Sequence, residues 1–248
     1  MPLPSSLGDL TASRATAKRV CALAIMAKAP SMGKSRLRAA LSTTETTALS
    51  SAFLQDTWQL ATCSAFDPVL CFAPATAESE FREVVPAAWI TSAQPFVQEG
   101  ADLTTRVIHA FQHLFAMGYE NVALMNSDTP DLPLAALQTA YAHLVTPGSN
   151  PGIVLGPTDD GGYYLVGLHR SASLRLAALF EGMEWSTPHV LDDTLARATV
   201  MNLQVQLGPP WTDVDTPPDL DALQARLRAA APNIATRTRA VLVWTAPQ

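Results

Sequence analysis

Two acidic segments far apart in the chain have the residue types of a divalent cation site. The first reads Asn126-Ser127-Asp128-Thr129-Pro130-Asp131 and the second Thr212-Asp213-Val214-Asp215-Thr216-Pro217. A diphosphate is repelled by carboxylates alone, so aspartates at strand ends make sense when Mg²⁺ or Mn²⁺ lies between protein and phosphate. Taken alone, Asp128 before Thr-Pro is more typical of a turn carboxylate that bonds nearby backbone. Together the two segments favour an enzyme that binds a nucleotide.

A basic loop near the N-terminus could bind phosphate. Lys28, Lys34 and Arg36 surround Gly33, and backbone N–H groups beside cations near a helix start suit phosphate oxygens. A strand-to-helix turn with solvated charges explains the same residues equally well. The acidic segments favour the functional interpretation.

A third cluster reads Asp159-Asp160-Gly161-Gly162-Tyr163. Asp-Gly is a common hairpin signal, but two adjacent acids exceed what a turn requires. We therefore expect Asp160 to contact an acceptor or to act as a general base. Because side chains alternate faces in a strand, at most one of Tyr163 and Tyr164 should line the pocket.

Trp185 and Ser186 precede Thr187-Pro188, so an aromatic ring lies beside an expected helix N-terminus. That arrangement suits stacking on a sugar or base. Alternatively, Thr187 caps the helix and Trp185 packs over the sheet, and for Thr187 we favour this structural role. Thr216, Pro217 and Asp219 predict an N-cap with a capping box, which makes Asp219 structural.

The elements that must position these residues alternate between strand-length apolar runs and helical patterns, which predicts an α/β fold with a mainly parallel sheet. Expected strands are 20–26, 68–72, 121–125, 152–155 and 163–167. Expected helices are 45–63, 78–85, 101–117, 134–144, 187–198 and 216–230. Residues 240–245 are expected to form an edge strand or a packed tail. In such sheets functional groups gather beyond the carboxyl ends of the strands.

Length and composition limit how many domains the chain can form. With 248 residues, 48% of them hydrophobic and only 15% charged, the chain should form one domain around a sheet buried on both faces. We expect a flexible N-terminal tail over residues 1–18, the domain over 19–231, and an extension of the same domain over 232–248.

Charge and cysteine usage exclude several classes of partner. The net charge of −6 and the lack of a Lys/Arg stripe argue against nucleic-acid binding. No apolar run approaches the ~20 residues that span a bilayer, so no membrane is expected as a partner. Cys21, Cys63 and Cys71 form no Cys-x-x-Cys pair, which fits the reducing cytoplasm. The five histidines have no metal-ligand spacing.

The chain resembles the bacterial DUF2064 family of glycosyltransferase-like proteins, in the GT-A-like nucleotide-diphospho-sugar transferase superfamily. The resemblance rests on motifs in a fixed order from Val20 to Leu227: Ala27–Pro30 with Lys34–Leu37, Gln98–Leu103, Ser127–Leu132, Gly156–Leu165, Trp185–Pro188 and Asp213–Pro217. It is also similar to the 2-phospholactate and molybdenum-cofactor guanylyltransferases. Two departures are a shortened loop, where Ser31-Met32-Gly33 runs straight into Lys34, and Asp159 in place of a glutamate.

The resemblance implies a single-domain, GT-A-like (Rossmann-like) three-layer sandwich and a set of site residues. Asp128 and Asp215 would hold Mg²⁺ or Mn²⁺, with Asp213 in reserve. The nucleotide would be bound by Lys28, Gly33, Lys34, Arg36 and Ser127. Catalysis would depend on Asp160, Lys34 and Arg36, and the substrate would contact Asp159, Gly161, Gly162, Tyr163, Trp185 and Ser186.

Three functions remain open from the sequence. The first is a metal-dependent transfer of a sugar from a nucleotide-sugar donor to a small acceptor. The second is nucleotidyl transfer, in which an NTP is joined to a small phosphorylated metabolite and pyrophosphate leaves. The third is a non-catalytic nucleotide-binding partner, motivated by the shortened loop. A homodimer stays open as an assembly.

Overall fold

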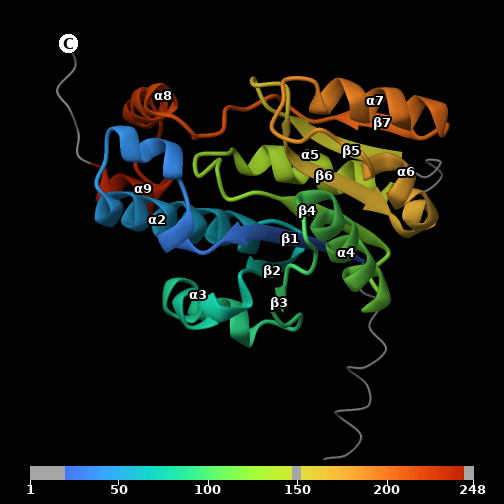
Figure 1. Cartoon of the computed structure of the whole chain (residues 1–248), viewed down its shortest axis with the longest axis horizontal. Coiled ribbons are helices and arrows are strands. Elements are labelled where there is room, and N and C mark those ends of the chain that lie inside the picture. The colour runs from blue at the N-terminus through green and yellow to red at the C-terminus, as the bar shows by residue number, and fades with distance from the viewer. Residues whose placement is uncertain (1–19, 147–151, 243–248) are drawn as a thin grey trace, which may run out of the picture.

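One mixed sheet forms the centre of the molecule. In the computed structural model, which describes residues 20–146 and 152–242, seven strands follow the order β3-β2-β1-β4-β6-β5-β7 (Figure 1). The strands are β1 (Cys21–Lys28), β2 (Asp67–Ala73), β3 (Phe96–Val97), β4 (Asn121–Met125), β5 (Gly152–Pro157), β6 (Tyr163–His169) and β7 (Gln204–Leu207). Neighbouring strands are parallel except where β6 pairs with β4 and β5. The predicted mainly parallel mixed sheet is confirmed.

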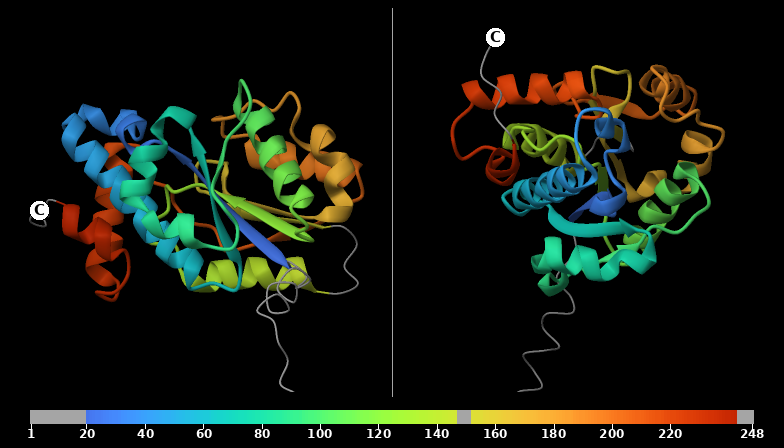
Figure 2. Two further views of the ribbon diagram at one scale, coloured as in Figure 1. Left: turned by 90° about the horizontal axis from the view of Figure 1, so that it is seen from below. Right: turned by 60° about the vertical axis from the view of Figure 1, so that its left-hand side comes forward.

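Helices cover both faces of the sheet (Figure 2). One face packs against α2 (Thr43–Thr62), α3 (Glu78–Val84) and α5 (Leu134–Val145), and the other against α4 (Leu103–Ala116), α6 (Leu176–Phe180) and α7 (Val190–Val200). Two further helices, α8 (Pro217–Ala229) and α9 (Thr236–Val241), share a smaller apolar cluster with α2. The predicted three-layer sandwich is thus confirmed.

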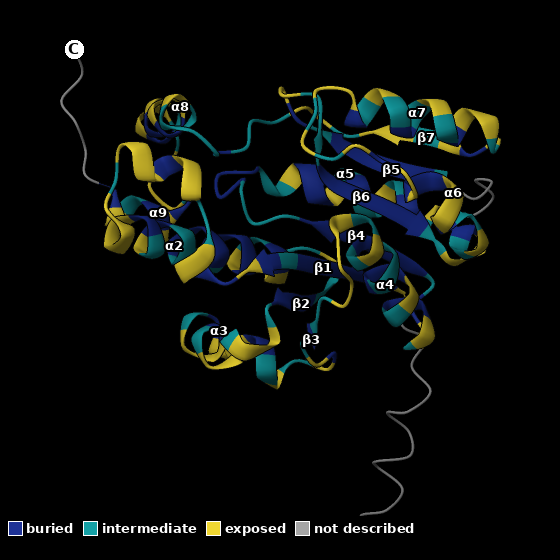
Figure 3. Cartoon of the chain, viewed as in Figure 1, coloured by how far each residue is buried: buried dark blue, intermediate teal, exposed yellow. Residues whose placement is uncertain are grey.

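Burial on both faces explains the apolar strands. In β1, Leu23 and Ile25 belong to the core under α2 and α5, whereas Ala22 and Ala24 belong to the core under α4, and all four are fully buried. Because alternate residues of a strand point to opposite faces, a strand covered on both sides must be apolar throughout. Figure 3 shows these buried strands between helices whose outer faces are exposed.

Capping boxes fix the starts of the helices that frame the site. Ser42 and Glu45 cap α2, and Asp102 with Thr105 caps α4. Thr216 and Asp219 form the predicted capping box of α8, with Pro217 as its first residue. Each box satisfies backbone N–H groups that would otherwise lack a partner, which holds the preceding segment in place.

Several elements differ from the sequence-based prediction. The short strands β3 and β7 and the helices α6 and α9 were not predicted, because two to six residues give too little periodicity. For residues 240–245 an edge strand or a packed tail was left open. Ala240 and Val241 are helical, which excludes the edge strand for these two, and 243–248 lie outside the described residues. The predicted tail over 1–18 also lies outside them. No described helix has the length and apolar character needed to cross a membrane.

Candidate functional site

Residues from several strand ends line one cavity of about 440 Å³. Lys28 ends β1, Asp128 follows β4, and Thr158 and Asp160 follow β5. Because β6 runs against its neighbours, its first residue, Tyr163, lies at the same edge of the sheet. The cavity therefore lies where ligands bind in open α/β sheets.

The two acidic segments meet at this cavity. The backbone N–H of Val214 donates to the carbonyl of Asp128 at 3.0 Å, which joins the segment after β4 to the segment before α8. Lys34 Nζ lies 2.5 Å from Asp128 Oδ1 and 3.1 Å from Asp215 Oδ1, and it also donates to the Val214 carbonyl at 2.6 Å. One ammonium thus holds the two aspartates together.

The Lys34 side chain is only 6% exposed. Burial alone would lower its pKa, but the charges and hydrogen bonds of Asp128 and Asp215 outweigh burial and raise the pKa above its ordinary value. Lys34 therefore stays protonated at neutral pH.

A further carboxylate, that of Asp213, interacts electrostatically with the other aspartates of the site. Burial, then the charges of Asp160, Asp215 and Asp128, raise the pKa of Asp213 to about 7, and Lys34 opposes this shift. Asp213 also lines the cavity. The residue held in reserve from the sequence thus belongs to the same cluster as Asp128 and Asp215.

The basic loop consists of two short 3-10 turns, Pro30–Met32 and Ser35–Ala39. The Gly33 N–H already donates to the Pro30 carbonyl at 3.1 Å, so any contact of Gly33 with a phosphate would not use that N–H. Arg36 is 65% exposed and lies 3.6 Å from Asp215, and it lines the cavity together with exposed Lys28.

A smaller cavity of about 180 Å³ adjoins the basic loop. It is lined by Gly33, Lys34, Ser50 and Ser127, among others. It shares four lining residues with the larger cavity, namely Met26, Lys28, Asp128 and Asp215. The predicted nucleotide-binding residues are therefore divided between two adjoining cavities.

The predicted hairpin forms between β5 and β6. The two adjacent acids in its turn, Asp159 and Asp160, have different hydrogen-bond partners. Asp160 lines the larger cavity, and its Oδ1 accepts from the Thr158 hydroxyl at 2.6 Å and from the Gly162 N–H at 3.0 Å. Both of these hydrogen bonds use the same carboxylate oxygen. Asp159 is exposed, accepts from the Thr212 hydroxyl and does not line the cavity. Gly162 reaches the cavity, whereas Gly161 does not.

An aromatic wall closes one side of the larger cavity. Trp185 Nε1 donates to the Thr104 hydroxyl at 2.8 Å, and its ring meets Tyr163 edge-on at 6.3 Å. Trp185, Ser186 and Tyr163 all line the cavity. Tyr163 and Tyr164 belong to opposite cores, as expected, yet both reach the cavity at the strand end, so the prediction that only one could do so is wrong.

The donor set suits a hard divalent cation. No group of three or more His, Cys, Asp or Glu side chains in residues 20–146 and 152–242 is arranged to hold a metal ion. Asp128 and Asp215 nevertheless offer two carboxylates beside a cavity that Asp213 and Asp160 also line. Mg²⁺ commonly takes one or two carboxylates and completes its shell with water and phosphate oxygens. The residues therefore fit such an ion once Lys34 moves aside.

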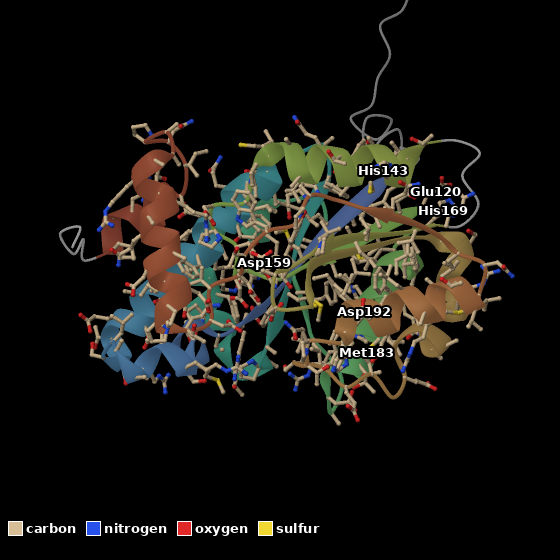
Figure 4. The ribbon with its side chains drawn as sticks, turned by 90° about the horizontal axis from the view of Figure 1, so that it is seen from above. Glu120, His143, Asp159, His169, Met183 and Asp192 are labelled. Atoms are coloured by element: carbon tan, nitrogen blue, oxygen red, sulfur yellow. The ribbon has the colours of Figure 1, made fainter. Side chains whose placement is uncertain are left out.

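One sequence-based role outside the cluster is wrong, and one acidic residue has a structural partner. The carboxylate of Asp131 is buried in an ion pair with Arg226 of α8 at 2.7 Å. Thr187 does not cap α7, whose N-cap residue is His189, and its hydroxyl donates to the Glu184 carbonyl. In Figure 4, Asp159 is well separated from Glu120 and His169.

Sequence reasoning assigned no role to Gln98, Arg106 and Asn126, which also line the larger cavity. Gln98 follows β3, and its amide donates to the carbonyls of Ala27 and Cys71. Arg106 donates from Nε to the Gly100 carbonyl at 3.0 Å. The motif Gln98–Leu103 was the available signal, but a two-residue strand gave no reason to place it at the sheet edge.

Comparison with protein families gives one match. The model of a family described as an uncharacterized protein conserved in bacteria (DUF2064) matches residues 53–187, more than half of the chain. No curated protein matches the chain.

Solved structures share the fold. A candidate nucleotide-diphospho-sugar transferase from Desulfovibrio desulfuricans G20 is 28% identical, with a TM-score of 0.77 over 90% of this chain and 95% of that one. A cytidylyltransferase from Leptospira borgpetersenii is 14% identical, with a TM-score of 0.58 over 91% and 94%. A 4-diphosphocytidyl-2C-methyl-D-erythritol synthase from Anaerococcus prevotii is 11% identical, with a TM-score of 0.56 over 85% and 97%. The last two are similar in fold alone.

Proposed function

The chain belongs to the DUF2064 family, as its motifs predicted, and on that premise we propose that it is a metal-dependent transferase that moves a sugar from a nucleoside diphosphate sugar to a small acceptor. One observation carries the proposal: two acidic segments and a basic loop meet through Lys34 at a 440 Å³ cavity beyond the strand ends. The similarity to the Desulfovibrio protein supports the donor class.

The basic loop would neutralise the leaving diphosphate. Lys28 and Arg36 line the larger cavity, so their charges lie where the diphosphate would be. Positive groups fixed near developing negative charge lower the barrier to departure of a phosphate. A divalent cation held by Asp128 and Asp215 would add Lewis-acid stabilisation of the same oxygens.

The acceptor would bind between Asp160 and the aromatic wall. Its hydroxyl oxygen forms a bond to the anomeric carbon, and the bond from that carbon to the diphosphate oxygen breaks. The electron pair leaves with the nucleoside diphosphate, and the hydroxyl proton passes to Asp160 Oδ2. Trp185 would offer an apolar face to the acceptor, and its ring is held in position by Thr104.

Nucleotidyl transfer is the second candidate, supported by the three cations of the basic loop, which also suit a triphosphate. In that reaction a phosphate oxygen of the acceptor attacks the α-phosphorus, and pyrophosphate leaves.

The products distinguish the two reactions. The protein would be incubated with Mg²⁺ or Mn²⁺, a panel of nucleotide sugars or NTPs, and pooled small acceptors, and products would be followed by ³¹P NMR. The proposal expects a free nucleoside diphosphate from a nucleotide sugar. Pyrophosphate from an NTP would favour the second candidate. Metal-dependent binding without either product would instead favour a non-catalytic nucleotide-binding partner.

A further inference from the structure

Lys34 contacts the two carboxylates that a bound cation would need. Its ammonium lies against Asp128 Oδ1 and Asp215 Oδ1 and donates to the Val214 carbonyl. A divalent ion on the same two carboxylates would lie next to this ammonium. Two positive charges a few ångströms apart in a partly buried site repel each other, so Lys34 opposes binding of the ion.

The two cavities give the competing cations separate approaches. Asp128 and Asp215 line both cavities and so form part of the wall between them. Lys34 lines only the smaller cavity. A ligand with its metal has room in the larger cavity, where Asp160 and Asp213 also lie. Lys34 therefore contacts the carboxylates from the side of the smaller cavity, while a metal ion would enter with its ligand through the larger one.

We propose that Lys34 is a displaceable internal cation: it pairs Asp128 with Asp215 in the ligand-free protein and withdraws into the smaller cavity when a divalent cation binds from the larger one. The proposal rests on the proposed function for the existence of the metal site. It assigns Lys34 a positioning role, because the residue sets how readily the metal enters.

The smaller cavity can receive the ammonium. The Ser50 hydroxyl, which lines it, is buried and has no hydrogen-bond partner among the described residues. The Phe53 ring already lies 5.6 Å from Lys34 Nζ and offers a cation–π contact. A buried hydroxyl without a partner is costly, so a donor arriving at Ser50 would be favourable.

The test is a Mn²⁺ titration of the full chain without nucleotide, followed by calorimetry. Lys34→Met keeps the length of the side chain and removes its charge. Lys28→Met is the matched control, because Lys28 lines both cavities but is exposed. We expect Lys34→Met to tighten Mn²⁺ binding by about tenfold or more, and Lys28→Met by less than about threefold, since exposed charges are screened.

A second variant tests where Lys34 goes. Ser50→Ala should weaken Mn²⁺ binding about two- to threefold, because the displaced ammonium loses a hydrogen bond. Lys34→Met removes the ion pair of Asp128 and leaves Asp215 with only its 3.6 Å contact to Arg36. Its melting temperature should therefore be lower in EDTA and should rise more with Mn²⁺ than that of the unsubstituted chain.

Two results would overturn the proposal in different ways. Equal Mn²⁺ affinity for the Lys34→Met and Lys28→Met variants would show that Lys34 does not compete, and would leave the metal site intact. If no variant binds Mn²⁺, the proposed function loses its metal ion. The proposed competition between Lys34 and that ion is then ruled out as well.

Discussion

At the scale of single residues, the site depends on carboxylates whose roles the sequence could only partly separate. Asp128 and Asp215 were predicted as a pair, and the structure brings both to Lys34. Asp159 and Asp160 are adjacent in sequence, yet only Asp160 lines the cavity. Their difference depends on the hydroxyls of Thr158 and Thr212, which come from different segments. Hydrogen bonds between distant segments cannot be read from a local motif.

The substitution Asp128→Asn tests whether the Asp128 carboxylate binds the divalent ion. The substitution keeps the shape of the side chain but removes the charge that a divalent ion requires, so metal-dependent nucleotide binding should weaken by about tenfold or more, which corresponds to about 1.4 kcal/mol. Binding would be measured by calorimetry with and without Mn²⁺.

Asp159→Asn is the matched control, because it removes one carboxylate nearby that does not line the cavity. Its effect on the same affinity should stay below about threefold, as expected for an exposed charge. Equal losses in the two variants would mean that net charge, rather than coordination by Asp128, governs binding.

At the scale of elements, the hairpin between β5 and β6 is packed directly against the start of α7. Gly161 has a φ of +87°, and a Cβ there would lie 2.1 Å from the Pro188 carbonyl oxygen. Its own carbonyl accepts from the Leu191 N–H at 2.9 Å. The sequence predicted the turn, because Gly-Gly after two acids is a turn signal, but not the contact with α7.

Gly161→Ala should therefore destabilise the protein by more than the ~1–2 kcal/mol of a left-handed backbone alone. Gly182→Ala is the control, since Gly182 also has a positive φ, +65°, but open space around its Cβ position. Urea unfolding of both variants measures the difference. If Gly182→Ala lowers the free energy of unfolding as much as Gly161→Ala does, the contact with Pro188 contributes nothing to the cost of the Gly161 substitution.

A buried ion pair links the first acidic segment to α8. Asp131 is 4% exposed and accepts from Arg226 at 2.7 Å and from Trp211 Nε1 at 3.2 Å. Its position at the end of a predicted metal motif gave no hint of this partner 95 residues away. The pair holds the chain segment that carries Asp213 and Asp215.

Arg226→Met leaves the Asp131 carboxylate without its cation, which should cost about 3–5 kcal/mol in urea unfolding. Asp131→Asn together with Arg226→Met should be less destabilising than the sum of the two single changes, because the neutral amide needs no cation and can still accept from Trp211. Strict additivity in this double-mutant cycle would show that the two side chains are not coupled.

At the scale of the whole molecule, the fold was largely predictable and the site less so. Strands buried on both faces need continuous apolar runs, and these runs located β1, β2, β4, β5 and β6. The edge strands β3 and β7 are short, and β7 is mostly exposed, so their sequences carry little pattern. The cavity depends on how all these strand ends converge, which only the tertiary structure determines.

The most direct test of the account is a thermal-shift titration with nucleoside diphosphate sugars, in the presence of Mn²⁺ and in EDTA. A ligand at about 100 times its dissociation constant adds about 2.7 kcal/mol of apparent stability. We expect a rise in melting temperature that requires both sugar nucleotide and Mn²⁺ and that Asp128→Asn reduces by about half or more. A melting temperature unchanged by every nucleotide and metal combination would contradict the assignment of Lys34, Asp128 and Asp215 to a donor site.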